Sequence, residues 1–374
     1  MSEHCIFVLF LLSLSTPALS WRIGHEYTII AERQAPACTP TAGGSPTVDD
    51  VPAIESAMAA CPSGTIMIPA KSTYHINSEI SFAKCSNDTK AWSDKDAVLN
   101  LEDVNDVSIV SKTGTGMIDG NGQAAWDLLN KDKNYPRVKC LLYLTGKTSG
   151  VTISGLTMRN PPNVFSSVKQ KRCIAEKYRQ VRPWWYWHPH GKHQSRERDD
   201  CIAIQNGAED ITVTNIQCTG YHGLSIGSIG KTAGKVDTFK NIHFKNAKMT
   251  KCSKAAGIKI YSGGYGTAEV SNVTWENVMV DGTSYAFQVQ SCYGSDEKER
   301  ASQPSTAKLT DIVVKGFGGK TDKNEAVASI NCPAKGTCGL SLTEMKVQSA
   351  NGGEEYQCSN AGSIGVKCVP GASG

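Results

Sequence analysis

Two adjacent aspartates, a histidine and a lysine are the residues of this chain best suited to acid–base chemistry. Two carboxylates held close together resist double ionisation, so the pKa of one rises and that group keeps a proton to donate. The other stays ionised and can act as a base or orient a water molecule. The histidine can tune the protonation of the pair, and the lysine can bind an anionic substrate. They lie in three short clusters, Asp199-Asp200-Cys201, Gly220-Tyr221-His222-Gly223 and Gly257-Ile258-Lys259.

Each cluster also has a simpler interpretation. An Asp-Asp pair in a loop is usually solvated, a histidine between glycines is usually a turn residue, and a lysine on a strand usually faces solvent. Adjacent aspartates on a straight strand would point to opposite faces. The chain must therefore turn at Asp199 and Asp200 for both to reach one groove, and a disulfide between Cys201 and Cys218 would help to hold that turn. The chemistry requires a fold that places the three clusters side by side.

A recurring pattern of short strands predicts such a fold. From about residue 98 onward, alternating apolar residues are punctuated by Asn or Gly, which suit bends in the left-handed conformation. Ile211, Ile242 and Val273 follow one another at equal steps of 31 residues. This period predicts a solenoid of stacked β-coils, in which related positions line up along one outer groove. The alternative is a β-sandwich, whose turn signals recur every 8–12 residues, roughly, without a longer period.

The open end of a solenoid needs a cap, and residues 47–70 predict one. Asp49 and Asp50 are placed to cap a helix, which is followed by Pro-Ser-Gly and a strand over residues 65–70. The chain has no low-complexity linker, so we expect one domain over residues 21–374. The predicted helix carries an apolar stripe of Ile54, Ala57, Met58 and Cys61.

Residues 1–20 have the pattern of a signal peptide. An apolar run from Cys5 to Leu14 ends in Ala18-Leu19-Ser20, and it is too short to span a bilayer as a helix. We therefore expect a secreted, extracellular protein, in which disulfides form. Asn87 and Asn272 begin predicted glycosylation sequons. Short spacings predict the disulfides Cys201–Cys218, Cys332–Cys338 and Cys358–Cys368, and also Cys38–Cys61.

Residues 169–198 differ from their surroundings in charge and composition. They hold nine Lys and Arg against two Glu, together with three Trp. Removing this surplus of seven positive charges from the net charge of +4 leaves −3 for the rest of the chain. The apparent basicity is therefore local, and it gives no evidence of nucleic-acid binding across the protein.

Three interpretations of this segment stay open. It could be an aromatic and basic platform for an anionic sugar, or a metal site at the sequence HPHGKH. The hypothesis that we favour is a stretch translated in the wrong frame or through an unspliced intron. That hypothesis accounts for the charge, for the odd number of cysteines left once Cys5 is removed, and for a missing coil. It predicts that a coil is missing within residues 169–198, and that residues 181–198 form an irregular excursion that leaves the preceding coil incomplete.

The sequence resembles the family 28 glycoside hydrolases, the polygalacturonases and their relatives. The resemblance rests on DDCIAIQNG, CTGYHGLSIGSIG and GIKIYSGG, and extends from DDVPAIESAMAACPSG through IDGNGQAAWD and NPPNVFSS to the C-terminal cysteine pairs. It implies an all-β fold, a right-handed single-stranded parallel β-helix with a short N-terminal capping helix. It also implies inverting hydrolysis of pectic backbones without a metal ion or other cofactor. By the same resemblance Asp199 is the general acid, Asp200 helps to activate water, His222 matches the family's histidine, and Lys259 grips a galacturonate carboxylate.

The sequence departs from the family pattern at three places. Tyr221 stands where the family usually has Gly or Ser, and Gly257 stands where it has Arg. The family's Asn-Thr-Asp motif, which supplies a third carboxylate, is absent before Asp199. Both Tyr221 and Gly257 are candidate substrate-binding positions, and loss of the arginine side chain would open space beside the sugar. The combination of AAGIKIYSGG with YAFQVQSCYGSDE and the ending VKCVPGASG is similar to the endo-xylogalacturonan hydrolases within the family, whose substrate carries xylose.

These features predict a monomeric hydrolase whose partner is a pectic polysaccharide, with no nucleic acid and no membrane. One alternative is an endo- or exo-polygalacturonase acting on bare galacturonan. Another is a catalytically impaired pectin-binding β-helix, since the third carboxylate is missing. A calcium-dependent lyase shares this architecture and would release unsaturated products.

Overall fold

The computed structural model describes most of the chain from residue 140 onward and shorter stretches before it. The described residues are 9–10, 39–45, 47–60, 73–75, 78–81, 97–103, 106–111, 116–120, 122–132, 134–135, 140–169, 171–176, 179–181, 200–295, 297–322 and 326–374. Asp199, Asn87, Cys38, Cys61, the predicted strand over residues 65–70 and the sequence HPHGKH lie outside these ranges.

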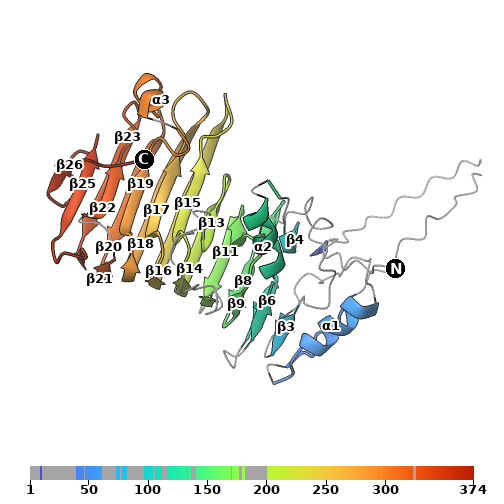
Figure 1. Ribbon diagram of the computed structural model, residues 1–374. Helices are drawn as coiled ribbons and strands as arrows, with labels where there is room; N and C mark the ends of the chain where they lie inside the picture. Colours follow the sequence, from blue (N-terminus) through green and yellow to red (C-terminus); the bar gives the residue numbers. More distant parts are fainter. Residues whose placement is uncertain are drawn as a thin grey trace, which may run out of the picture.

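The described strands stack into two sheets in which every pairing is parallel (Figure 1). This arrangement confirms the right-handed single-stranded parallel β-helix with an N-terminal helix, and it excludes the β-sandwich. The first sheet, called the groove sheet below, contains β1 (Leu9–Phe10), β4 (Ala97–Glu102), β7 (Cys140–Thr145), β10 (Val164–Val168), β13 (Ile202–Ile204), β15 (Leu224–Ile229), β17 (Lys254–Ile260), β19 (Tyr285–Gln290), β22 (Ala326–Asn331), β25 (Glu355–Ser359) and β26 (Cys368–Pro370).

The second sheet lies on the opposite side of each coil. Its bends fall at asparagines with left-handed φ, such as Asn215, Asn246 and Asn277, whose side-chain amides hydrogen-bond from coil to coil. Its members are β2 (Thr73–His75), β3 (Glu79–Ser81), β5 (Ser108–Val110), β6 (Met117–Asp119), β8 (Val151–Ser154), β9 (Thr157–Arg159), β11 (Lys171–Glu176), β12 (Arg179–Val181), β14 (Glu209–Thr219), β16 (Val236–Thr250), β18 (Thr267–Thr283), β20 (Lys308–Lys315), β21 (Gly318–Thr321), β23 (Thr337–Thr343) and β24 (Lys346–Gln348). The strands β14, β16 and β18 are the long ones, with 11, 15 and 17 residues.

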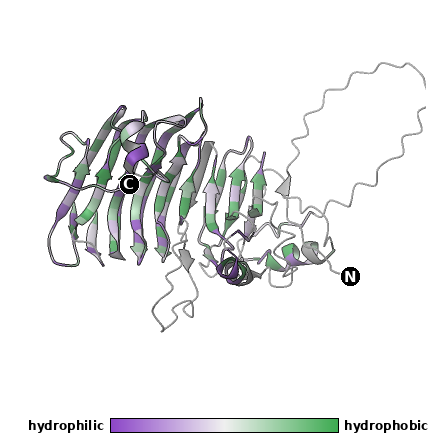
Figure 2. Cartoon of the chain, turned by 45° about the horizontal axis from the view of Figure 1, so that its top comes forward, coloured by the Kyte–Doolittle hydropathy of each residue, from purple (hydrophilic) through white to green (hydrophobic). Residues whose placement is uncertain are grey.

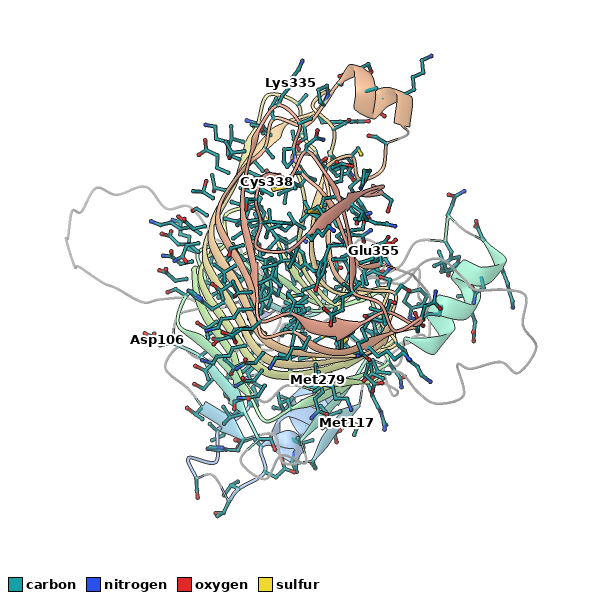
Figure 3. The ribbon with its side chains drawn as sticks, turned by 90° about the vertical axis from the view of Figure 1, so that its left-hand side faces the viewer. Asp106, Met117, Met279, Lys335, Cys338 and Glu355 are labelled. Atoms are coloured by element: carbon teal, nitrogen blue, oxygen red, sulfur yellow. A yellow bond between two sulfur atoms is a disulfide. The ribbon has the colours of Figure 1, made fainter. Side chains whose placement is uncertain are left out.

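Apolar side chains of successive coils stack inside the solenoid. Ile211 is paired with Ile242, and Ile242 with Val273, so the predicted step of 31 residues is the register of adjacent coils. Phe244 and Trp275 stack with ring centroids 5.5 Å apart. The alternation of apolar and polar residues along each strand is visible in Figure 2, and Figure 3 looks along the stack into its filled interior. Each coil is thus held mainly by contact with its neighbours.

In the described part of the chain, three helices accompany the coils: α1 (Val51–Ala60), α2 (Gln123–Lys131) and α3 (Glu297–Ser302). The first is the helix predicted before the solenoid, and its Ile54 is buried as expected. Ala57 packs against the core while partly exposed, and nothing is described for the side chain of Met58.

The two aspartates before α1 differ in role. Asp49 caps the helix weakly, because its Oδ1 accepts a 3.3 Å hydrogen bond from the Val51 N–H. Asp50 is buried and accepts hydrogen bonds of 2.6 Å from the N–H groups of Gly43 and His75. Asp50 therefore ties the cap to the strand β2 rather than capping the helix with its side chain.

The prediction that residues 169–198 leave a coil incomplete was wrong for their first part. The strand β11 pairs in parallel with β8 and β14, and β12 pairs with β9 and β14. Backbone N–H and C=O groups make these ladders, so a strand can form without the side-chain alternation on which the prediction relied. Residues 182–199 lie outside the described ranges.

Three of the four disulfides predicted from short spacings are present, and Cys38–Cys61 stays a prediction. Cys201 is bonded to Cys218, and further bonds join Cys332 with Cys338 and Cys358 with Cys368. Asn272 is exposed, and its glycosylation stays a prediction. In the described part of the chain, no helix has the length and apolar character needed to cross a bilayer.

The strand β1 lies inside the predicted leader. Its residues Leu9 and Phe10 pair with Leu101 and Glu102 of β4, at the end of the groove sheet. Cleavage after residue 20 would remove β1 and leave β4 as the terminal strand of this sheet among the described residues.

Candidate active site

The fold brings the three sequence clusters together on neighbouring strands of the groove sheet. Asp200 lies two residues before β13, His222 lies in the turn before β15, and Lys259 is on β17. Because these strands are adjacent, side chains far apart in sequence meet on the outer face of one sheet. Asp199 lies outside the described residues, so its place in this site stays a prediction.

Asp200 is the centre of the described site. Its side chain is 2% exposed and lies in a buried ion pair with Lys259, whose Nζ is 2.5 Å from Oδ2. The hydroxyl of Ser225 donates a 2.5 Å hydrogen bond to the other oxygen, Oδ1. Both carboxylate oxygens therefore have a donor that favours the ionised form.

The electrostatic environment of Asp200 keeps it charged despite its burial. Burial, the largest influence, would raise the pKa of the Asp200 carboxyl. The positive charges of Lys259, Lys254 and His222, together with the hydrogen bond from Lys259, lower that pKa below its usual value. An ionised carboxylate buried in this way can accept a proton or orient a water molecule.

Close backbone packing holds the histidine turn against the neighbouring strand. Gly223 has φ +79°, and a Cβ at this position would lie 2.3 Å from the main-chain oxygens of both Lys254 and Ala255. The carbonyl of Gly223 accepts a 3.0 Å hydrogen bond from the N–H of Cys201. The turn carrying His222 is therefore tied to Cys201, the residue that follows Asp200. The disulfide to Cys218 holds the same residue.

The structure does not support Tyr221 as a substrate contact. Its side chain is 1% exposed and packs against Phe165 of β10, with ring centroids 4.8 Å apart. The tyrosine fills the core beneath the turn, which explains how a bulky residue is accommodated before His222.

The expected open space beside Gly257 is also absent. A Cβ at this position would lie 2.3 Å from the main-chain oxygen of Gln288, and 2.9 Å from Cδ of Lys254. The space in which the family's arginine side chain would begin is thus filled by the side chain of Lys254 from the same strand, and it is not an open cavity. Lys259 is 4% exposed and engaged with Asp200, so its grip on a substrate carboxylate stays a prediction.

Sequence reasoning missed three residues of this site, Ser225, Lys254 and Tyr293. The ring of Tyr293 lies 5.4 Å from Nζ of Lys259 and is part of a chain of aromatic contacts with Tyr261 and Tyr265. A signal for Ser225 existed, because it stands between the core residues Leu224 and Ile226 and so points to the opposite face of β15. Lys254 carried no signal, since a lysine before a buried strand usually points to solvent.

No metal site is evident at these residues. Within the described ranges, the group spaced for a metal ion is Cys201, Cys218 and Cys252, whose sulfurs lie within 4.8 Å of one another. Cys201 and Cys218 are joined in a disulfide, so this group cannot offer three thiolate ligands.

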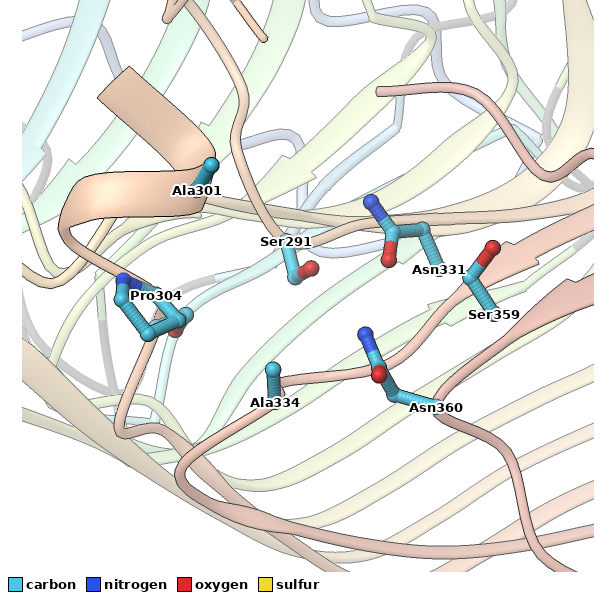
Figure 4. Close-up of a pocket in the computed structure, with 8 residues that line it drawn as sticks. Ser291, Ala301, Pro304, Asn331, Ala334, Ser359 and Asn360 are labelled. Carbon is cyan, nitrogen blue, oxygen red and sulfur yellow. The ribbon is translucent and has the colours of Figure 1, made fainter. Parts of the chain in front are cut away.

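A cavity of about 370 Å³ lies farther along the stack, between the turns that follow β19, β22 and β25 (Figure 4). Its lining includes Ser291, Asn331 and Ser359 at the ends of these strands, and Pro304 after α3. None of the predicted site residues lines it. Near it the C-terminal segment crosses the groove sheet, where Asn331 donates a 2.6 Å hydrogen bond to the carbonyl of Gly374.

Comparison with protein families gives one match over most of the chain. The family described as glycosyl hydrolases family 28 matches residues 57–177 and 193–368. The gap between the two matched ranges, residues 178–192, falls inside the segment of unusual composition.

Curated relatives and a solved structure agree with this match. The chain is 40% identical over 411 aligned positions to a probable endo-xylogalacturonan hydrolase A of Aspergillus flavus, with both chains covered completely. It is 42% identical to endo-xylogalacturonan hydrolase A of Aspergillus tubingensis, over 90% of this chain and 91% of that one. The crystal structure of the endo-xylogalacturonan hydrolase from Aspergillus tubingensis superposes with a TM-score of 0.69 at 39% identity, and covers 91% of this chain and 100% of that chain.

Proposed function

The chain belongs to the glycosyl hydrolases of family 28, and on this premise we propose that it cleaves the galacturonan backbone of xylogalacturonan. The names of its relatives support this substrate, a pectic polysaccharide whose backbone carries xylose. The observation that carries the proposal is the Asp200 carboxylate, buried and kept ionised between Lys259 and Ser225.

The reaction is an inverting hydrolysis of α-1,4-galacturonosyl linkages. Asp199 donates its proton to the glycosidic oxygen, and the bond from that oxygen to C1 breaks. Asp200 accepts a proton from a water molecule that attacks C1 from the opposite face of the sugar. The proton returns from Asp200 to Asp199 through solvent after the products leave. His222 tunes the charge of this pair, and Lys259 binds a galacturonate carboxylate.

The roles of the two aspartates are tested by single substitutions. Asp199→Asn and Asp200→Asn should each lower kcat by at least about 10²-fold, the lower end of general acid–base contributions, with little change in substrate binding. The readouts are new reducing ends and the anomeric form of the first product. A variant with a tenth of wild-type kcat would remove its aspartate from the proposed role.

Three other functions have different signatures. A polygalacturonase would cleave bare galacturonan at least as well as the xylosylated polymer. A pectin-binding protein without activity would bind the polymer and release no reducing ends, as the missing Asn-Thr-Asp motif allows. A lyase would instead release unsaturated products that absorb in the ultraviolet.

Secretion of a monomer completes the proposal. The apolar run before residue 20 supports export, and the extracellular location suits a polymeric substrate. The mature N-terminus and the mass of the protein in solution, measured on the secreted product, test both statements.

A further inference from the structure

A second buried lysine, Lys254, lies beside the Asp200 site and takes no part in the proposed proton transfers. It is the first residue of β17 and is 3% exposed. Removing an ammonium group from water is costly unless nearby groups compensate its charge, and lysine is seldom buried otherwise. The position of Lys254 therefore calls for an electrostatic reason rather than a packing one.

The path of the Lys254 side chain explains the glycine at position 257. A Cβ on Gly257 would lie 2.9 Å from Cδ and 3.1 Å from Cε of Lys254. The aliphatic stem thus crosses the outer face of β17 directly over Gly257. Any larger residue there would displace the stem, or would force β17 away from the Gln288 carbonyl, which lies 2.3 Å from the same Cβ position.

The crossing takes place next to the Asp200 carboxylate. Gly257 is the register partner of Ser225 on β15, and the Ser225 hydroxyl is hydrogen-bonded to Asp200. Among the described residues, the charged groups that act on Asp200 are Lys259 and Lys254 from β17 and His222 from the turn before β15. Lys254 acts together with Lys259 to lower the pKa of the Asp200 carboxyl.

We propose that Lys254 is a positioning residue that supplies a second cation to the Asp200 site, and that residue 257 is glycine so that this lysine can cross the strand. The role rests on the proposed function, in which Asp200 activates water. With Lys254 in place, Lys259 can move from Asp200 to a substrate carboxylate without leaving the charge of Asp200 uncompensated. Lys254 then compensates the charge of Asp200, while Lys259 binds the substrate carboxylate.

The test removes the charge of Lys254 and keeps its length. In Lys254→Met the acidic limb of the kcat/KM profile should move to higher pH by about one unit, because an opposite charge nearby lowers a carboxyl pKa by at least that amount. At neutral pH, KM should change little. The matched control is Lys248→Met on β16, where the side chain is 52% exposed and the limb should stay in place.

A double-mutant cycle tests the link between the two positions. Gly257→Ala should move the acidic limb in the same direction, since its Cβ displaces the lysine. In the Lys254→Met background the same glycine substitution should add little further shift, because no charge remains to be displaced. Additive shifts would show that residue 257 acts independently of Lys254.

The pH dependence of thermal stability separates this inference from the proposed function. The lowered pKa of Asp200 contributes stability that is lost as pH falls through the folded-state pKa. In Lys254→Met that loss should begin at a higher pH, whether or not the wild type cleaves galacturonan. A wild-type protein without activity would contradict the proposed function but not the role of Lys254. Identical acidic stability curves for wild type and Lys254→Met, with identical rate profiles where activity is found, would overturn the role of Lys254.

Discussion

The hydroxyl of Ser225 stabilises the ionised form of Asp200 through one short hydrogen bond. Ser225→Ala should raise the pKa of Asp200, because the charged carboxylate loses a donor and stays buried. The acidic limb of the pH–rate profile should then move to higher pH. A hydrogen bond to a charged group contributes about 1.5–3 kcal/mol, which corresponds to a shift of roughly one to two pH units.

The matched control for Ser225 lies three strands away in the same register row. Ser329 is buried on β22, and its hydroxyl contacts Ser373 rather than the aspartate. Ser329→Ala should leave the acidic limb where it is. An unchanged limb in Ser225→Ala would mean that this hydrogen bond does not set the charge of Asp200.

At the residue scale the sequence predicted the charged groups better than their surroundings. Asp200, His222 and Lys259 could be found because they stand in short motifs separated by about one coil. The burial of Tyr221 could not, since it depends on Phe165 from another coil. The approach of Lys254 to Asp200 depends in the same way on the register of β15 and β17.

The turn that carries His222 depends on a glycine packed against the next strand. Gly223→Ala should be strongly destabilising, by about 3 kcal/mol or more, because a Cβ would lie 2.3 Å from two main-chain oxygens at a positive φ. Gly234 also has positive φ (+69°) but open space around it, so Gly234→Ala should cost only about 1 kcal/mol. Denaturant unfolding measures both, and equal losses would contradict the close-packing argument.

The Cys201–Cys218 disulfide should matter for catalysis as well as stability. Replacing both cysteines with alanine removes a cross-link with a sequence separation of 17, worth about 3 kcal/mol, and loosens the chain next to Asp200. Replacing Cys358 and Cys368 removes a comparable cross-link, with a separation of 10, several coils away. The variant without Cys201 and Cys218 should have a lower Tm and a lower kcat than the wild type. The variant without Cys358 and Cys368 should have only a lower Tm. Equal kcat in the two would mean that the first disulfide does not position the site.

At the element scale, the coil period was readable because interior residues must stack at constant register. Ile211, Ile242 and Val273, which are 31 residues apart in the sequence, are register partners on adjacent strands. The strands β11 and β12 were missed because main-chain pairing with β8, β9 and β14 does not need an alternating side-chain pattern. The helix α2 was also not predicted, since it interrupts a run of strands.

For the whole molecule, the origin of the basic segment remains a testable hypothesis. The family match omits residues 178–192, while the chain on both sides matches. If this stretch arises from a wrong frame or an unspliced intron, the mature transcript should encode a strand, an Asn-Thr-Asp triplet and a second strand before Asp199. Sequencing the mature transcript checks this. Recovery of the present sequence, in a purified protein of full activity, would make the segment a genuine part of the enzyme.

In the proposed function, a site built around Asp200 hydrolyses a galacturonan backbone that carries xylose. The most direct measurement compares initial rates of reducing-end release from xylogalacturonan and from bare polygalacturonan, using the purified protein with Asp200→Asn as control. We expect faster release from the xylosylated polymer, release of saturated products, and loss of both activities in Asp200→Asn. Equal or faster cleavage of the bare polymer, or activity that survives Asp200→Asn, would contradict the proposed function.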